Sequence, residues 1–203
     1  MRFQLSFATT LIVLLASCQA TSRSKPGAAE SLDLPIAGDL PVAQPPYQQV
    51  EADWKQRIDQ PYVYIEARGS YTGIGKLLER AFKAAVADGL EISGPPFALY
   101  YDDPGAVAVD ELRMRACLPV ESQPTPQAPL AFDVLPSTTV VYAFIGGPYP
   151  EVPRAYPSLF AFMRRLNWSE SGPIREIYLR SPSSVGDWSE LVTEVQIPAA
   201  LAR

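Results

Sequence analysis

The sequence repeats itself at one fixed offset, and this repetition restricts the possible folds more than any other feature of the chain. When the chain is shifted by 78 residues, aromatic residues and turn residues coincide in the same order. The coinciding positions are Tyr64 with Tyr142, Gly69 with Gly147, Tyr71 with Tyr149, Phe82 with Phe160, Ser93-Gly94-Pro95 with Ser171-Gly172-Pro173, Tyr100 with Tyr178, and Pro104 with Pro182. Matches at a single offset indicate a duplicated structural unit. We therefore expect one repeat over about residues 50–120, a second over about residues 130–200, and a proline-rich linker at residues 123–129.

Each repeat has the pattern of a strand, a helix and two further strands. The expected strands are residues 62–65, 97–101 and 112–118 in the first repeat and residues 140–144, 175–179 and 191–197 in the second. Apolar residues with helical spacing lie after the first strand of each repeat, namely Ile74, Leu77, Leu78, Ala81, Phe82 and Ala85, then Val152, Ala155, Tyr156, Leu159, Phe160 and Met163. Such a stripe packs one face of a helix against a sheet. The predicted fold class is α+β, a mainly antiparallel sheet with one helix per repeat on its outer face.

Strand alternation predicts an aromatic face on the side of the sheet that the helices leave free. Successive side chains of a strand point to opposite faces. We assign the mainly apolar set of each strand to the helix-packed core, which includes Val63 and Ile65, Phe97 and Leu99, and Ile177. The opposite face then carries Tyr62, Tyr64, Glu66, Tyr100, Tyr142, Phe144, Glu176 and Tyr178. Two repeats side by side would form an aromatic cleft that holds carboxylates and suits flat, apolar or cationic ligands. The alternative is that these tyrosines are present because tyrosine favours strands and cross-strand pairs.

The composition excludes several kinds of site. The 203 residues include no histidine, which excludes a Ser-His-Asp or Cys-His catalytic centre and any histidine-ligated metal. Two cysteines cannot form a four-cysteine zinc site. A formal net charge of −5 disfavours a surface that binds nucleic-acid phosphates. We expect no metal, no cofactor and no nucleic-acid partner.

The N-terminus has the layout of an export signal that ends at a cysteine. A short basic start and an apolar run precede Leu15-Ala16-Ser17-Cys18, which resembles a bacterial lipobox. The resemblance implies that a signal peptide of residues 1–17 is removed and that Cys18 carries the lipid. Gln19, rather than aspartate, follows, which implies the outer membrane, facing the periplasm, in a Gram-negative cell. Residues 18–49 are expected to form a proline-rich tether. The alternative is a plain secretory signal that contains a cysteine.

A series of short motifs occurs in both repeats. The motifs are Tyr64 with Gly69-Ser70-Tyr71, Gly94-Pro95, Tyr100-Tyr101-Asp102-Asp103-Pro104, Gly147-Pro148-Tyr149, Gly172-Pro173 and Glu176-Ile177-Tyr178-Leu179. Over residues 50–203 this pattern resembles the GyrI-like domain, the effector-binding domain also attached to AraC- and MerR-type regulators. The resemblance implies a central cleft between the repeats for amphipathic or cationic aromatic compounds, with Glu176 at its centre. A DNA-binding domain is not expected, because the tether lacks the length and periodicity of a helix-turn-helix.

Three functions are compatible with these features. The first is a membrane-anchored small-molecule-binding protein, with the ligand contacted by Glu176, Tyr178, Tyr64, Tyr100, Tyr142, Phe144 and Glu66. The second is a hydrolase of reactive electrophilic compounds that uses Glu176 with Tyr178, residue types that resemble those of some members of the superfamily. The third is an interaction module of the cell envelope. We favour binding, because catalysis also needs a positioned water and oxyanion stabilisation that no motif indicates.

Overall fold

The computed structural model describes residues 38–202, and the structural statements below refer to this part of the chain. Two α-helices and a large, mostly antiparallel sheet confirm the α+β class. The strands are β1 (Val42–Ala43), β2 (Asp53–Arg57), β3 (Gln60–Arg68), β4 (Phe97–Tyr100), β5 (Arg113–Pro119), β6 (Ala131–Leu135), β7 (Thr138–Gly146), β8 (Trp168–Glu170), β9 (Ile174–Tyr178) and β10 (Val192–Leu201). The helices are α1 (Ile74–Ala87) and α2 (Tyr156–Arg165), with 3₁₀ helices η1 (Tyr71–Gly73), η2 (Tyr149–Ala155) and η3 (Trp188–Glu190).

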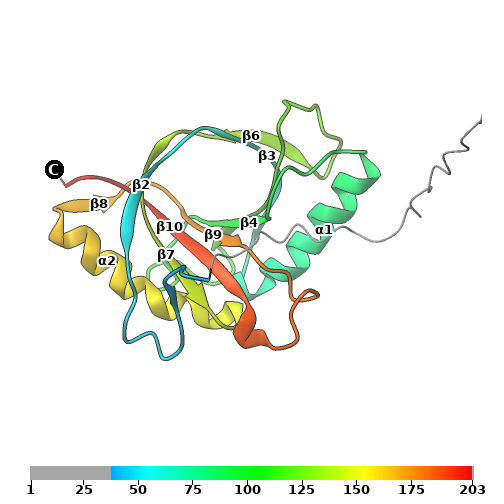
Figure 1. The fold of residues 1–203 in the computed structure, drawn as a ribbon. Helices are drawn as coiled ribbons and strands as arrows, with labels where there is room; N and C mark the ends of the chain where they lie inside the picture. Colours follow the sequence, from blue (N-terminus) through cyan, green and yellow to red (C-terminus); the bar gives the residue numbers. More distant parts are fainter. Residues whose placement is uncertain (1–37, 203) are drawn as a thin grey trace, which may run out of the picture. The chain divides into compact units, whose positions relative to one another are not determined.

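The sheet is centred on the antiparallel pair β4 and β9. Its order is β1-β7-β10-β9-β4-β5-β3-β6, while β2 also pairs with β7 and β8 with β10. One row of directly paired residues crosses the sheet on a single face, in the order Ile65, Ala116, Ala98, Glu176, Val195 and Ala143. The first two of these pack with α1 and the last two with α2. Both helices therefore cover the same face, one on each half of the sheet (Figure 1).

The other face of the central strands is enclosed by the ends of the sheet. β2 precedes β3 in the chain but pairs with β7, and β6 precedes β7 but pairs with β3. Each half of the sheet therefore contributes one strand to the other half. Where the two connections meet, Arg57 Nη2 donates to the Pro136 carbonyl at 2.6 Å and the Ser137 N–H donates to Asp59 Oδ1 at 2.5 Å. Figure 1 shows β2, β3 and β6 arching over β4 and β9. Phe97 and Leu99 are consequently buried on the face away from the helices.

The two helices follow the predicted stripes to different degrees. Leu77, Ala81 and Ala85 are the buried residues of α1, at the spacing that the sequence predicts. The second helix was expected to include Val152, but this part of the chain is the 3₁₀ helix η2, and α2 begins only at Tyr156. Pro153 has no N–H to donate within this segment, which explains why a regular α-helix does not form there.

Part of the segment expected to be a tether packs against the sheet. β1 pairs in parallel with β7, and Ala43 and Tyr47 are buried in the core under α2. The Tyr47 hydroxyl donates to the Gly146 carbonyl at 2.9 Å. The folded part therefore begins before residue 50. Cys18 and the expected signal peptide of residues 1–17 lie outside the described residues.

The assignment of faces for the second strand of each repeat, β4 and β9, is wrong. We expected Phe97, Leu99 and Ile177 to face the helices, but the register places them on the enclosed face. The same register places Tyr100, Glu176 and Tyr178 on the helix-covered face. The physical reason is that the curled sheet buries both faces of β4 and β9, so hydrophobicity alone does not identify the helix side of these strands.

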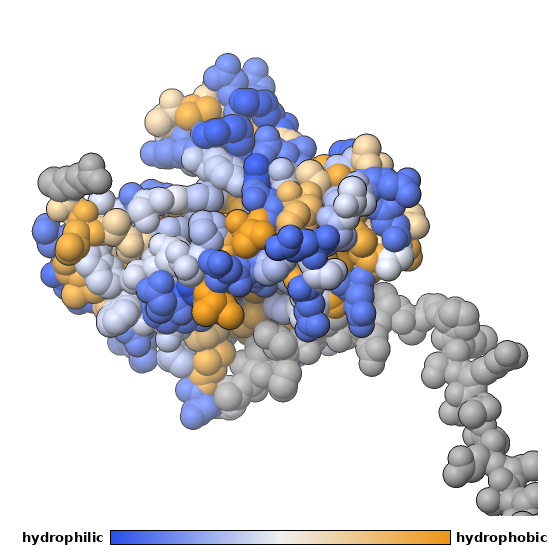
Figure 2. All heavy atoms as spheres, turned by 90° about the horizontal axis from the view of Figure 1, so that it is seen from above, coloured by the Kyte–Doolittle hydropathy of each residue, from blue (hydrophilic) through white to orange (hydrophobic). Residues whose placement is uncertain are grey.

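The face of the molecule seen in Figure 2 is mostly polar. Figure 2, which views the molecule from above Figure 1, shows a face on which apolar residues form small separate spots. Exposed large apolar side chains such as Ile58, Val86 and Trp188 are of the scattered kind that is common on protein surfaces. Within residues 38–202, no helix combines the length and the apolar composition needed to cross a membrane.

We predict that Tyr47 stabilises the domain. Replacing Tyr47 with alanine is expected to lower the free energy of unfolding by about 3 kcal/mol, because a buried aromatic ring is removed. Tyr47→Phe is expected to cost about 1 kcal/mol, because it removes only the hydrogen bond to the Gly146 carbonyl. Urea unfolding followed by circular dichroism measures both values. Equal stability of all three proteins would show that residues 42–47 do not belong to the folded part.

Candidate functional site

Glu176 occupies the centre of the sheet on its helix-covered face. It is the third residue of β9, it pairs with Ala98 on β4 and Val195 on β10, and its side chain is only 3% exposed. Because α1 packs on one half of this face and α2 on the other, Glu176 lies where the two halves meet. A carboxylate in this position needs hydrogen-bond donors to replace water.

Three tyrosine hydroxyls surround the Glu176 carboxylate. Tyr156 donates to Oε1 at 2.5 Å, Tyr178 donates to Oε2 at 3.0 Å, and Tyr100 donates to Oε2 at 3.4 Å. The hydroxyls of Tyr100 and Tyr178 are also 3.0 Å apart. We call these four residues the tyrosine–glutamate cluster. Burial raises the pKa of each tyrosine well above its ordinary value, so that the hydroxyls remain protonated and act as donors.

Different elements position the three tyrosines. Tyr100 ends β4, Tyr178 ends β9, and Tyr156 is the first residue of α2. Tyr71 of η1 packs on Tyr100, with ring centroids 4.6 Å apart, and Tyr149 of η2 packs on Tyr178 at the same distance. Tyr71 donates to the Asp102 carbonyl at 2.9 Å, and Tyr149 donates to the Arg180 carbonyl. The packing of five aromatic side chains therefore fixes the environment of one carboxylate.

The Glu176 carboxylate has no cationic partner among residues 38–202. The ion pairs of the described residues do not include it, and its hydrogen bonds come from neutral phenols. Burial raises the pKa of Glu176 to about 7, although the hydrogen bonds from the three tyrosines oppose this shift. The site therefore combines aromatic rings with one buried acid whose charge is uncompensated, an arrangement that favours a cation.

The remaining predicted ligand residues lie on the other face of the sheet, so the expectation of a single shared face is wrong. Tyr62, Tyr64, Glu66, Tyr142 and Phe144 belong to β3 and β7 and pair with residues of the enclosed face. For β3 and β7, the prediction that these side chains point away from the helices is correct. The error lies in β4 and β9, whose parity is the reverse of the expected one.

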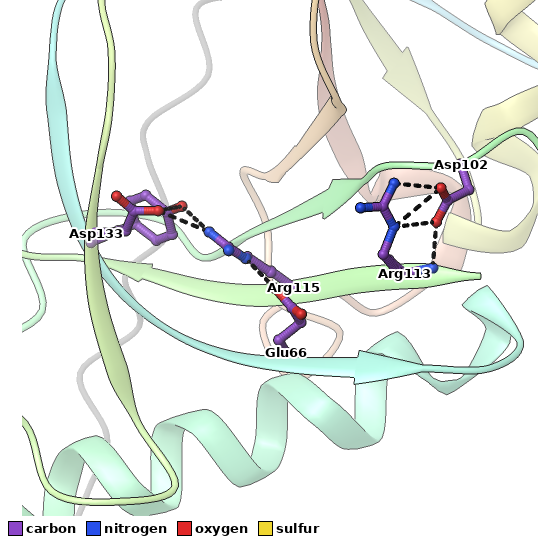
Figure 3. Close-up of polar contacts among 6 residues, drawn as sticks. Glu66, Asp102, Arg113, Arg115 and Asp133 are labelled. Atoms are coloured by element: carbon purple, nitrogen blue, oxygen red, sulfur yellow. Dashed lines mark hydrogen bonds and ion pairs between the residues drawn. The ribbon is translucent and has the colours of Figure 1, made fainter. Parts of the chain in front are cut away.

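Contacts within the protein already occupy several of these residues. Arg115 Nε donates to Glu66 at 2.8 Å, and Nη1 donates to Tyr62 and to Asp133, each at 2.9 Å (Figure 3). The same guanidinium lies 4.0 Å from the centre of the Tyr64 ring. On the other half, the Lys55 ammonium lies 4.4 Å from the centre of the Tyr142 ring. These residues form ion pairs and cation–π contacts that join strands, and they do not contact Glu176.

Tyr156 is a member of the cluster that sequence reasoning missed. The sequence places it in the apolar stripe of the second helix, which does not reveal that its hydroxyl reaches a carboxylate on β9. Tyr71 and Tyr149 gave a usable signal, because they coincide at the 78-residue offset directly before each helix. Among the described residues, no group of three or more metal-binding side chains is present.

The fold and site define a two-helix α+β domain with an aromatic, acidic centre suited to a small organic ligand. The chain belongs to the GyrI-like family: the family described as a GyrI-like small molecule binding domain matches residues 54–200. No curated protein sequence matches the chain.

Solved structures share the fold at low sequence identity. The C-terminal domain of EcmrR has a TM-score of 0.68 and 21% identity, and the match covers 75% of this chain and 99% of that domain. In the complex of EcmrR with DNA the match has a TM-score of 0.67 and 21% identity, covering 75% of this chain and 58% of the longer EcmrR chain. SAV2435, solved with bound tetraphenylphosphonium, has a TM-score of 0.53 and 15% identity, and the match covers 74% of this chain and 94% of that one.

We predict that Glu176 makes stability depend on pH. Its pKa of about 7 in the folded protein lies above the ordinary value of 4.5, so the folded state binds the proton more tightly. This contribution is complete below the ordinary pKa and is lost as the pH rises to about 7. Relative to Glu176→Gln, which cannot titrate, the wild-type protein should lose about 3 kcal/mol of unfolding free energy between about pH 4 and about pH 8. Urea unfolding at several pH values measures this difference, and parallel profiles for the two proteins would contradict the shift.

Proposed function

We propose that the protein binds amphipathic or cationic aromatic compounds at the tyrosine–glutamate cluster. The observation that carries this proposal is the buried Glu176 carboxylate, which has three phenol partners and no ion pair among residues 38–202. A cation would supply the missing countercharge, and the rings of Tyr100, Tyr156 and Tyr178 would supply apolar and cation–π contacts. The bound tetraphenylphosphonium of SAV2435, which has the same fold, is a compound of this class.

Ligand entry would require rearrangement at the start of α2. Tyr156 closes the cluster from this helix, and its hydroxyl donates to Glu176 Oε1 at 2.5 Å. A cation that approaches Oε1 would replace this donor, while Tyr178 and Tyr100 would keep Oε2 hydrogen-bonded. The cation would also favour the ionised carboxylate, so binding near neutral pH would be accompanied by release of a proton from Glu176.

The residues of the enclosed face have no part in this site. Tyr62, Tyr64 and Glu66 contact Arg115, which already places a cation among them. A second cation there would meet like charge, which is unfavourable. Hydrolysis by Glu176 with Tyr178 has no specific feature in its favour, because tyrosine hydroxyls occupy both carboxylate oxygens.

We also infer that the domain arose as a duplicated unit. The element order β3-α1-β4-β5 corresponds to β7-α2-β9-β10, and the two orders meet at the β4–β9 pair. The equivalent tyrosines support the inference, because Tyr71 donates to the carbonyl of Asp102 and Tyr149 donates to that of Arg180. On this view the cluster draws one tyrosine from the end of each central strand, and the acid comes from the second copy only.

We propose that the protein is located in the cell envelope and is anchored to a membrane by lipid. The support is the sequence Leu15-Ala16-Ser17-Cys18 behind a short apolar run. Acyl chains on Cys18 would hold the domain at a membrane, in the outer membrane facing the periplasm if the cell is Gram-negative. The ligand would then be met outside the cytoplasm.

We predict that tetraphenylphosphonium binds the chain and that Glu176 is required. Glu176→Gln should weaken binding at least about tenfold, equivalent to about 1.4 kcal/mol, because the countercharge is lost. Glu66→Gln is the matched control, since it removes the same charge from the opposite face and should leave the affinity unchanged. Isothermal titration calorimetry measures the dissociation constants. Wild-type affinity should also fall below about pH 7, where the carboxyl group is neutral. Equal binding by wild type and Glu176→Gln would refute the site.

We predict that Cys18 is lipidated. Full-length protein expressed in a bacterial host should incorporate labelled palmitate and fractionate with membranes, whereas Cys18→Ser should lose both properties. Cys117→Ser is the matched control, because Cys117 is a buried strand residue of the folded domain. Membrane fractionation of Cys18→Ser without label would indicate a different anchor.

A further inference from the structure

Arg175 is buried on the face of β9 opposite to Glu176. It pairs with Leu99 on β4 and Gln196 on β10, which places its side chain on the enclosed face of the sheet, and the residue is 4% exposed. The guanidinium carbon lies 4.0 Å from the centre of the Phe97 ring, and Nη2 donates to Oε1 of Gln60. Among residues 38–202, no carboxylate forms an ion pair with this guanidinium. Burial of an arginine without an anion raises the free energy of the folded state, because the charge loses its hydration and gains no ion pair.

Polar atoms near Arg175 also lack partners. Nε of Arg175 and Nε of Arg57 are both buried donors without an acceptor, and Oε1 of Gln196 is a buried acceptor without a donor. Gln196 is paired directly with Arg175 across β9 and β10, so the two side chains share the enclosed face. Gln196 Nε2 donates to Glu194 at 2.7 Å, which fixes the orientation of the amide and leaves Oε1 free. Unsatisfied buried groups are uncommon, and here two donors and one acceptor occur in the same region.

The charges in this region are unbalanced. Lys55, Arg57 and Arg175 are its cations. Glu194 pairs with Lys55 at 2.6 Å, and Asp59 is close enough to act on Arg57 electrostatically without forming an ion pair with it. Arg57 and Arg175 are close enough to interact unfavourably: burial, together with the charge of Arg57, lowers the pKa of Arg175 to about 10. Arg115 in the other half shows the usual solution, since Glu66 and Asp133 both pair with it (Figure 3). Neither Arg57 nor Arg175 forms an ion pair with a carboxylate of residues 38–202.

We propose that the enclosed interior holds a small oxoanion that also carries a hydroxyl group, such as hydrogen phosphate or a hydroxycarboxylate. The oxygens of the anion accept hydrogen bonds from Nε of Arg57 and of Arg175, and its hydroxyl group donates to Oε1 of Gln196. This chemistry matches each of the three unsatisfied atoms with a partner of the complementary kind. The site is independent of the proposed cation site, because Arg175 and Glu176 point to opposite faces of β9.

Arg57 also indicates where the anion enters. It bridges the two exposed connections of the sheet through its bond to the Pro136 carbonyl, and the bond from Ser137 to Asp59 joins the same connections. These two contacts lie beside Arg57, which is the more exposed of the two arginines. Their opening would expose Nε of Arg57 first and Nε of Arg175 behind it.

Arginine Nε–H resonances in ¹⁵N-correlated NMR spectra of the purified chain test the proposal directly. Titration with phosphate at constant ionic strength should shift the Nε–H signals of Arg57 and Arg175 along saturable curves with one shared dissociation constant. Lactate and acetate are two carboxylates that differ in the hydroxyl group, which only lactate carries. Saturable shifts with phosphate, with lactate or with both show whether the site takes a phosphate or a hydroxycarboxylate. Sulfate, which has no proton to donate, should bind at least about tenfold more weakly than phosphate.

Variants separate a specific site from a general salt effect. Arg175→Met should abolish the saturable shift at Arg57 Nε, and it is expected to fold because it replaces an unpaired buried charge with an apolar side chain of similar length. Arg57→Met should abolish the shift at Arg175 in the same way. Arg113→Gln removes the same charge from an arginine paired with Asp102 and should leave both shifts unchanged. Shifts that do not saturate, that are equal in chloride and phosphate, or that persist in Arg175→Met would overturn the proposal. The proposal would also be overturned if NMR cross-peaks show that bound water contacts both Nε–H groups and phosphate does not change these cross-peaks.

Discussion

The antiparallel pairing of β4 with β9 is the interaction on which the rest of this structure depends. It joins the two halves of the sheet through four directly paired positions, from Phe97 opposite Ile177 to Tyr100 opposite Ile174. Each half carries its helix on the same face, so this seam leaves the centre of that face between α1 and α2. The tyrosine–glutamate cluster occupies that centre, and its Tyr100 and Tyr178 end the two paired strands.

The register of the β4–β9 pair also determines which groups surround the charged side chains of β9. Side chains alternate along a strand, so Arg175 and Glu176 are neighbours in sequence and yet cannot neutralise each other. Glu176 is left with phenols and Arg175 with an amide and an aromatic ring. A shift of one residue would exchange the two and place a guanidinium among the tyrosines, so the register specifies the chemistry as well as the packing.

Much of the fold could be predicted from the sequence, and the wrongly assigned strand faces have one cause. The stripe of Leu77, Ala81 and Ala85 predicted α1 because only one of its faces is buried. β4 and β9 are buried on both faces, so their apolar residues gave no information about which face the helices cover. Glu176 was singled out by its position in the motif Glu176-Ile177-Tyr178, whereas its partner Tyr156 comes from a distant helix and required the tertiary structure.

Arg115 and Arg175, both on the enclosed face, show that the balance of charge differs from one buried ionic group to the next. Arg115 is held by Glu66, Asp133 and Tyr62, so its charge is balanced by groups of the protein itself. Arg175 is more deeply buried and has one amide acceptor and one ring. If burial of a charge served packing alone, methionine or leucine would do so at lower cost at position 175. In the two proposals, an anion from outside the chain balances this guanidinium and a cation balances the unpaired carboxylate on the opposite face. The same short strand would then present complementary charges to two different ligands, one on each side of the sheet.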